Sequence, residues 1–198
     1  MRRSARIVSV AGLLCSITCV TILHIVRTDL SPLSHRLSEY ADGPYGWMMT
    51  AVFITLGCSV MALGIALWAE KRRNKGAWII LALALLAAVG TILSGVFRTG
   101  ASDISEAIHS RASAIAVVAV VALALACSVS LARRRPCAAS DPVGAGLAVT
   151  AAALAVMSPV WHHTRWTGLN QRLLWIVLIT WLLRAAWEPV PQLDEEAA

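Results

Sequence analysis

All five histidines of this chain lie within or beside the polar stretches that separate long apolar runs. They are His24 at the end of the first run, His35 and His109 in the first and third connections, and His162 and His163 in the fifth. Odd-numbered connections between membrane spans share one side of the bilayer, so these imidazoles are expected on the same face. Imidazole titrates near neutral pH and suits proton transfer.

Five carboxylates occupy the same connections: Asp29, Glu39, Asp42, Asp103 and Glu106. A carboxyl group at a poorly hydrated membrane boundary has a raised pKa and can deliver a proton as a general acid. A short helix over residues 32–40, with Leu33 and Leu37 toward lipid, would bring His35 and Glu39 together one turn apart. The alternative interpretation of this pair is an ion pair at the surface.

Helix capping explains only part of the third connection. Asp103 followed by Glu106 has the spacing of a capping box at the start of a helix. His109 would then lie inside that helix, near the level of the lipid head groups, where capping gives it no role. Structural and functional interpretations of His109 both stay open.

We predict catalytic roles for four of these side chains, which are Glu39, His35, Asp29 and His109. Other residues near the same face could bind a substrate, because arginine grips phosphate and an aromatic ring stabilises a developing cation. This predicted binding set consists of Tyr40, Trp47, Arg98, Asp103, Glu106, Arg111, Trp161, His162, Arg165, Arg172 and Trp175.

Trp175 and Trp181 differ from the other tryptophans because they lie inside the last apolar run. Six residues apart on a helix, they point to different faces. The main interpretation is that both rings pack in the protein interior. In the alternative, functional interpretation, one ring lines a cavity and the other faces lipid.

The sequence predicts no metal site and no cofactor. A zinc site needs three or four converging ligands, and no spacing such as His-Glu-x-x-His occurs. His162 and His163 are adjacent and would point about 100° apart on a helix. Haem would need histidines deep in facing helices, and only His24 and His109 approach that depth.

The elements that position these residues are membrane helices. The chain has 198 residues, of which 58% are hydrophobic and 14% charged, against about a quarter charged in soluble domains. A helix needs roughly 20 apolar residues to cross a bilayer. Six runs meet this length, at 7–26, 47–69, 77–97, 112–132, 143–161 and 169–187. We therefore predict an all-α polytopic membrane protein, a compact six-helix bundle formed by one domain over residues 1–187. Residues 188–198 are predicted to form a disordered cytoplasmic tail.

Eleven of the 17 arginines and lysines fall on the side opposite the histidines. Positive residues favour the cytoplasm, so both termini are predicted to be cytoplasmic and the histidine face extracytoplasmic, in the cell membrane. The basic stretches at 71–75 and 133–135 fit this topology and contact with anionic membrane lipids, and no nucleic-acid partner is expected.

Several of these residues also form a pattern of their own. Ser38-Glu39-Tyr40, then Gly43 and Tyr45-Gly46-Trp47 entering the second run, with a histidine before the fourth, resemble a bacterial and archaeal family known as domain of unknown function 998. The resemblance covers most of the chain and implies a six-span fold. It also implies Phe-Pro-x-Asp at the end of the third span. Here that stretch reads Phe97-Arg98-Thr99-Gly100, with Asp103 displaced.

The expected function is that of a membrane-embedded enzyme acting on a lipophilic small-molecule substrate, such as an isoprenoid, at the outer ends of the helices. Proton-initiated cyclisation with Glu39 or Asp29 as the acid is one version, and lipid phosphoester hydrolysis is an alternative. A second alternative is a non-enzymatic helper subunit or small transporter, because the spans carry almost no ionisable residues away from their ends. Such a chain would bind a membrane partner or a second copy of itself.

Overall fold

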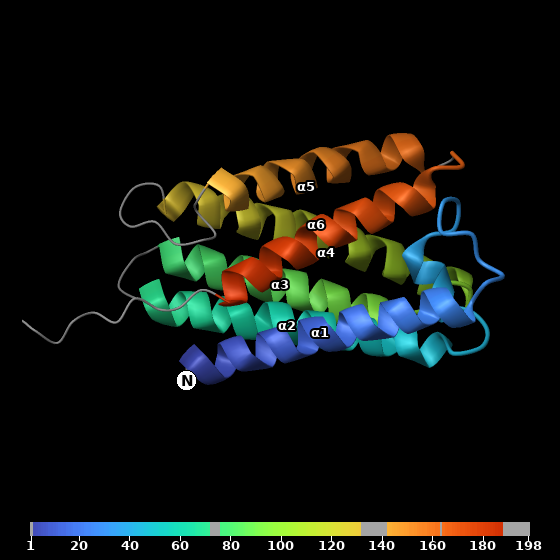
Figure 1. Cartoon of the computed structure of the whole chain (residues 1–198), viewed down its shortest axis with the longest axis horizontal. Coiled ribbons are helices and arrows are strands. Elements are labelled where there is room, and N and C mark those ends of the chain that lie inside the picture. The colour runs from blue at the N-terminus through green and yellow to red at the C-terminus, as the bar shows by residue number, and fades with distance from the viewer. Residues whose placement is uncertain (1, 72–75, 132–141, 163, 188–198) are drawn as a thin grey trace, which may run out of the picture.

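In the computed structural model, the described residues are 2–71, 76–131, 142–162 and 164–187. They form six long helices and one short 3-10 helix, with no strand among them (Figure 1). The elements are α1 (Arg2–Val26), η1 (Leu37–Ala41), α2 (Gly46–Lys71), α3 (Gly76–Val96), α4 (Asp103–Leu131), α5 (Pro142–Trp161) and α6 (Thr167–Trp187). The prediction of an all-α chain is confirmed for the part that the structure describes.

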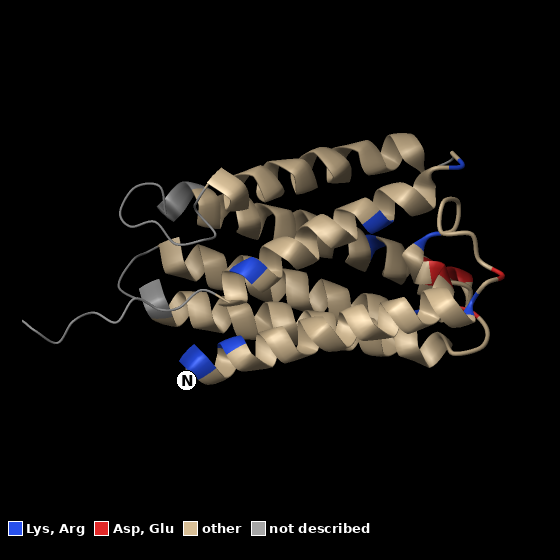
Figure 2. Cartoon of the chain, in the orientation of Figure 1, with Lys and Arg blue, Asp and Glu red and all other residues tan. Residues whose placement is uncertain are grey.

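The helices run alternately up and down along one axis (Figure 1). The start of α1 and the end of α6 lie at the same end of the bundle, where Arg6 Nη1 donates hydrogen bonds to the carbonyls of Ala185 at 2.9 Å and Ala186 at 3.1 Å. The opposite end carries the loop between α1 and α2, and the coloured acidic residues gather there (Figure 2).

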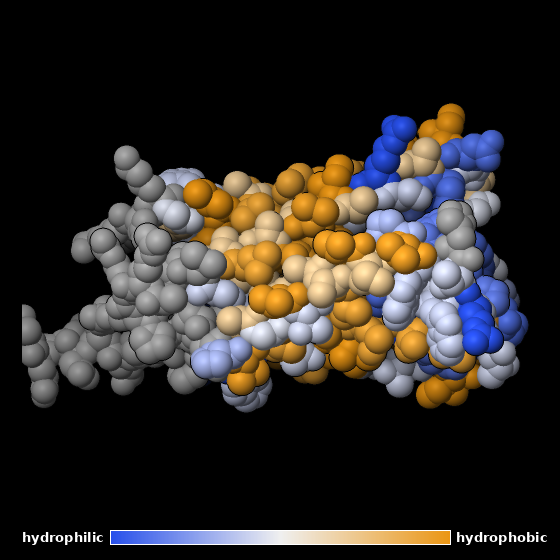
Figure 3. Space-filling view, turned by 90° about the horizontal axis from the view of Figure 1, so that it is seen from above, coloured by the Kyte–Doolittle hydropathy of each residue, from blue (hydrophilic) through white to orange (hydrophobic). Residues whose placement is uncertain are grey.

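Five of the described helices, α1 to α5, are long and apolar enough to cross a membrane. The exterior is correspondingly hydrophobic along the middle of the bundle and hydrophilic at the end with the α1–α2 loop (Figure 3). Helix α6 has 21 residues but carries Asn170, Gln171 and Arg172 near its start and Arg184 near its end. These polar residues interrupt its apolar sequence, and α6 is not among those five. The chain is therefore a multi-pass helical membrane protein.

The loop between α1 and α2 contains a different helix from the one predicted at 32–40. The 3-10 helix η1 begins only at Leu37, and Leu37 is buried with Tyr40 in the core, whereas Leu33 is 49% exposed. The prediction that both leucines face lipid is wrong for Leu37. His35 lies outside the helix, so it does not share a helical face with Glu39.

Two further predictions need correction. Helix α4 begins at Asp103, so His109 lies inside it as the capping interpretation expected, but the residue that caps it is Ser102, because the Ser105 N–H donates to Ser102 Oγ at 3.2 Å. Asp103 is therefore not the capping residue. Trp181 is only 1% exposed and packs in the core, so the functional interpretation that placed one of the two inner tryptophans against lipid is wrong for this ring. The predicted tail at 188–198 and His163 lie outside the described residues.

Small residues let neighbouring helices pack closely, as expected where lipid provides no hydrophobic drive for association. Gly64 of α2 lies against Ala84 of α3, and a Cβ built at Gly64 would be 2.2 Å from the Ala84 Cβ. Gly90 of α3 faces α4 in the same way, with the Ala112 carbonyl 2.8 Å from such a Cβ. These contacts bring α2, α3 and α4 together around the interior described below.

We predict that Gly64→Ala destabilises the bundle, because α2 and α3 must separate to admit the methyl group. Overpacking of this kind costs about 1–3 kcal/mol, and the melting midpoint in detergent should fall by at least about 2 °C. Gly146→Ala is the matched control, since no atom lies within 4 Å of its Cβ position. Its midpoint should stay level or rise, because alanine favours a helix over glycine by about 1 kcal/mol. Equal losses in both variants would contradict the close α2–α3 contact.

Candidate functional site

A cavity lies inside the bundle between α2, α3, α4 and α6, with η1 at one end. Its volume is about 130 Å³, comparable to engineered cavities of about 150 Å³ that bind benzene. Most of its lining is aliphatic or aromatic. The polar lining residues are Ser38, Thr91, Ser94, Ser113, Gln171 and Trp175. The space is thus suited to a small organic molecule that is mainly apolar.

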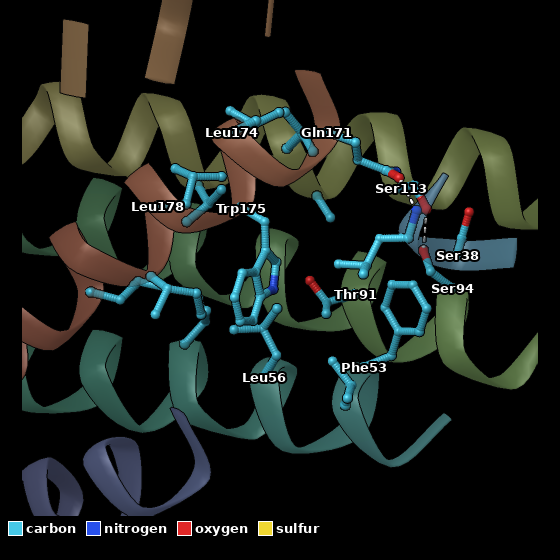
Figure 4. A pocket seen from close by; sticks show the side chains of 18 of the residues that line it. Ser38, Phe53, Leu56, Thr91, Ser94, Ser113, Gln171, Leu174, Trp175 and Leu178 are labelled. Atoms are coloured by element: carbon cyan, nitrogen blue, oxygen red, sulfur yellow. Dashed lines mark hydrogen bonds between the residues drawn. The ribbon is translucent and has the colours of Figure 1, made fainter. Parts of the chain in front are cut away.

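The polar groups are concentrated at the η1 end of the cavity. Figure 4 shows Ser38, Ser94, Ser113 and Gln171 at that end, away from Leu174 and Leu178. Ser113 Oγ donates to Ser94 Oγ at 2.9 Å, and Ser94 Oγ donates to the Gly90 carbonyl at 2.8 Å. An occupant would therefore meet hydroxyl oxygens at one end and hydrocarbon at the other.

His109 lies directly behind these serines and is only 4% exposed. Its Nδ1 is 2.8 Å from the Ser94 carbonyl and 3.0 Å from the Phe97 carbonyl. A carbonyl only accepts, so Nδ1 carries the proton, and in the neutral ring Nε2 is left with a lone pair. Nε2 is 3.5 Å from Ser113 Oγ, and the ring edge packs on Phe53. Ser113 thus stands between a proton acceptor and the cavity.

Arg172 joins the loop between α1 and α2 to the start of α6. Its Nε donates to His24 Nε2 at 2.9 Å, its Nη1 to the His35 carbonyl at 2.7 Å, and its Nη2 to Tyr40 Oη at 3.2 Å. The guanidinium also lies 5.5 Å from the centre of the Tyr40 ring. Because His24 Nδ1 bonds to the Val20 carbonyl, His24 Nε2 is free to accept from Arg172.

Glu39 forms an ion pair at the rim instead of reaching the cavity. Arg36 Nε donates to Glu39 Oε1 at 2.9 Å, and Arg36 Nη2 lies 3.7 Å from Glu106 Oε1. The predicted group of Glu39, His35 and His109 is not brought together, since His35 Nδ1 bonds to Ser34 and His109 to helix carbonyls. The sequence left open a surface ion pair between His35 and Glu39, and the ion pair of Glu39 is instead with Arg36.

Asp29 is likewise bound to an arginine. Arg27, which is buried, donates from Nε to Asp29 Oδ1 at 2.9 Å and from Nη2 to Asp29 Oδ2 at 2.8 Å. These hydrogen bonds lower the pKa of Asp29 below its usual value. A carboxylate held ionised in this way is poorly suited to donate a proton at neutral pH.

The acid with a raised pKa is Asp42, which the sequence assigned to no catalytic role. Burial raises its pKa, and the negative charges of Glu106 and Glu39 raise it further, against a lowering hydrogen bond from Thr99. Thr99 Oγ1 lies 3.5 Å from Asp42 Oδ1. In the sequence, Asp42-Gly43-Pro44 is fully explained as a turn, so nothing signalled this burial.

The remaining residues of the predicted binding set surround the rim. Trp47 is 67% exposed, and Arg98, Asp103, Arg111, His162 and Arg165 are also exposed, while Trp161 is half-buried. Arg165 lies 4.9 Å from the ring centre of Trp166. Of that set, only Trp175 lines the cavity.

Sequence reasoning missed the hydroxyl groups at the cavity. A serine or threonine in an apolar helix usually bonds to a carbonyl one turn earlier, as Ser94 does to Gly90 and Thr91 to Ala87. That role explains the residue whether or not a cavity is nearby. Among the described residues, no three His, Cys, Asp or Glu side chains are grouped as metal ligands.

Comparison with known proteins gives one match. The family model described as "Protein of unknown function (DUF998)" matches residues 9–188, which confirms the resemblance seen in the sequence. No curated protein and no solved structure matches the chain. The family description states no activity, so the function must be argued from the cavity and its surroundings.

We predict that Asp42→Asn stabilises the protein at neutral pH. A folded-state pKa above the unfolded value means that the protonated carboxyl contributes stability at low pH, which is lost as pH rises through the folded pKa. Asparagine removes the charge at every pH. Its melting midpoint should exceed that of the wild type by about 1–3 °C at pH 7, with a smaller difference at pH 4.

The control for Asp42→Asn is Asp103→Asn, which removes an equal charge from an exposed side chain. Its pH profile should follow that of the wild type. A lower midpoint for Asp42→Asn at pH 7 would show that the Asp42 charge stabilises the loop, for instance through Arg27, and would contradict the argument.

Proposed function

We propose that this chain, which belongs to the DUF998 family of proteins of unknown function, crosses the cell membrane six times and binds and acts on a lipophilic small molecule inside its helix bundle. The observation that carries the proposal is the apolar cavity with a hydroxyl-lined end beside a buried histidine. The cell membrane, six spans and cytoplasmic termini are parts of the same proposal.

The surroundings of α6 support its role as a sixth span. Its 21 residues give about 31 Å of helix, close to the roughly 30 Å hydrocarbon thickness of a bilayer. Two polar side chains near its start face protein. Asn170 Nδ2 donates to Ser158 Oγ at 2.7 Å. Arg172 donates to His24 of α1 and to two groups in the loop between α1 and α2. Leu173 and Ile176 are exposed, so lipid would still meet an apolar surface.

The charge distribution supports cytoplasmic termini. The ends of α1 and α6 lie together, and the basic stretches 71–75 and 133–135 belong to the connections expected at that same end. Positive residues concentrate on the cytoplasmic side of membrane proteins. With this orientation, the polar end of the cavity lies in the extracytoplasmic half of the bilayer.

For the chemistry, we assign proton transfer to His109 in place of Glu39 or Asp29. The two acids are tied to arginines outside the cavity, whereas His109 Nε2 faces Ser113, which lines it. The carbonyls of Ser94 and Phe97 accept from Nδ1, which orients the ring and leaves Nε2 as the proton acceptor. For a proton to pass between the occupant and Nε2, the Ser113 hydroxyl turns from Ser94 Oγ to His109 Nε2, delivers its proton there and takes one from the occupant. An isoprenoid-type molecule is one substrate class that suits this site.

The alternatives gain less support. Phosphoester hydrolysis would need arginines at the cavity, and Arg27, Arg36 and Arg172 instead bind protein groups. A helper subunit would need no internal cavity of this size.

We predict that a cysteine introduced at Ser34 in the α1–α2 loop is labelled from outside intact cells by a membrane-impermeant maleimide. Ser34 is exposed, and the proposed topology puts it outside. Native Cys137, in the α4–α5 connection outside the described residues, should be labelled only after the cells are opened. Peptide mass spectrometry distinguishes the two sites. Labelling of Cys137 in intact cells would overturn the orientation.

We further predict that Ala116→Leu displaces whatever copurifies with the protein. Ala116 lines the cavity, and three added carbon atoms would occupy part of its volume. Solvent extraction followed by mass spectrometry should show a lipophilic molecule stoichiometric with wild type and reduced at least about fivefold in the variant. Ala114→Leu on the same helix points outward and should retain it. Equal retention in both variants would refute binding in the cavity.

The role of His109 is tested by His109→Gln, because the glutamine amide can still donate to a carbonyl but cannot accept a proton at neutral pH. If His109 acts in chemistry, the molecule extracted from His109→Gln should differ in mass or isomer from that of wild type, since conversion is blocked. If wild type and His109→Gln yield the same molecule in equal amounts, the cavity binds it but His109 does not take part in its conversion.

A further inference from the structure

Among the described residues, the indole N–H of Trp175 is a buried donor at the cavity without a hydrogen-bond partner. Trp175 lines the space, and its Nε1 atom is buried with no hydrogen-bond partner in the described part of the chain. An indole N–H can only donate, and leaving such a group buried and unpaired costs about 1–3 kcal/mol. Figure 4 shows the ring extending from α6 into the middle of the cavity.

The hydroxyl groups along the cavity do not supply that partner. Thr91 Oγ1 donates to the Ala87 carbonyl and Ser94 Oγ to the Gly90 carbonyl, and neither oxygen accepts a hydrogen bond from Trp175 Nε1. Trp181 also has an unpaired buried Nε1, but it packs in the core and does not line the cavity. Trp175 therefore differs from Trp181 in having open space beside it.

We infer that the cavity selects an oxygen-bearing lipophile over a pure hydrocarbon, with a carbonyl, ether or hydroxyl oxygen accepting a hydrogen bond from Trp175 Nε1. This inference rests on the proposed function and specifies its substrate class. The oxygen accepts at the indole, and the apolar remainder lies among Leu56, Leu174 and Leu178. A hydrocarbon of the same size would fill the space but leave the N–H unpaired.

The test uses two small probes of similar shape, 2-heptanone and heptane, titrated into the full-length protein in detergent. Indole ¹⁵N labelling reports the N–H of each tryptophan, and Trp175→Phe assigns the Trp175 signal. Methyl-labelled methionine reports occupancy of the cavity whatever the probe's polarity, because Met49 lines it. Met49→Leu assigns that signal.

Both probes should shift the Met49 methyl signal, and only 2-heptanone should move the Trp175 N–H proton downfield. Trp181, assigned by Trp181→Phe, should not respond to either probe. Trp175→Phe enlarges the cavity for both probes, so the readout is the difference between them: 2-heptanone binding should weaken about fivefold more than heptane binding, as expected for one neutral hydrogen bond.

The outcomes separate the two proposals. If both probes shift Met49 but affect the Trp175 N–H equally, the cavity binds lipophiles and the inference about oxygen fails. If neither probe shifts Met49, binding in the cavity fails, and the inference with it. A Trp175 N–H that is already downfield and exchanges rapidly with solvent before any addition would assign a water molecule as the partner and overturn the inference.

Discussion

The guanidinium of Arg172 bonds to parts of the chain that are far apart in the sequence, and the outer half of the bundle depends on these bonds. It joins α6 to His24 at the end of α1, to the His35 carbonyl and to Tyr40 in η1. If α6 spans the membrane as proposed, protein must satisfy the donors of this arginine, because the hydrocarbon region of a bilayer offers no acceptors. Satisfying them fixes where the loop between α1 and α2 lies, and Gly168 allows the loop backbone to approach, since a Cβ there would be 2.4 Å from the His35 carbonyl oxygen.

This arrangement also places η1 at the polar end of the cavity. Once η1 is fixed, the backbone N–H of Leu37 donates to Gln171 Oε1, and Thr99 Oγ1 donates to the Ser38 carbonyl at 3.1 Å. The charged groups of the outer face are thereby used in holding the loop, as with Arg36 and Glu39, and the uncharged hydroxyls remain at the cavity. This separation is the reason why we propose His109, behind the serines, and not the acids for proton transfer.

The sequence predicted the helices well because hydropathy, which a bilayer constrains strongly, decides them. It also predicted that the acids and most histidines gather at one end. It could not predict the ion-pair partner of Glu39, because a partner three or four residues away depends on where the local helix begins, and η1 begins at Leu37 instead of 32. Nor could it identify Ser113 as a cavity residue, because a serine in an apolar run has the same sequence signature wherever its helix faces. Arg172 was predicted to bind substrate, and in the structure it contacts protein groups. The sequence could not show these contacts, because the partners lie in distant segments.

We propose that the cavity between α2, α3, α4 and α6 is a binding site and not a packing defect. A cryo-EM map of the protein purified from its own membrane tests this most directly, at a resolution that separates side chains. We expect non-protein density that contacts Trp175 and extends toward Ser113, while Arg172 holds the loop between α1 and α2 in place. A map in which Trp175 and Leu56 close the space, so that α2 and α6 pack without a gap, would contradict it.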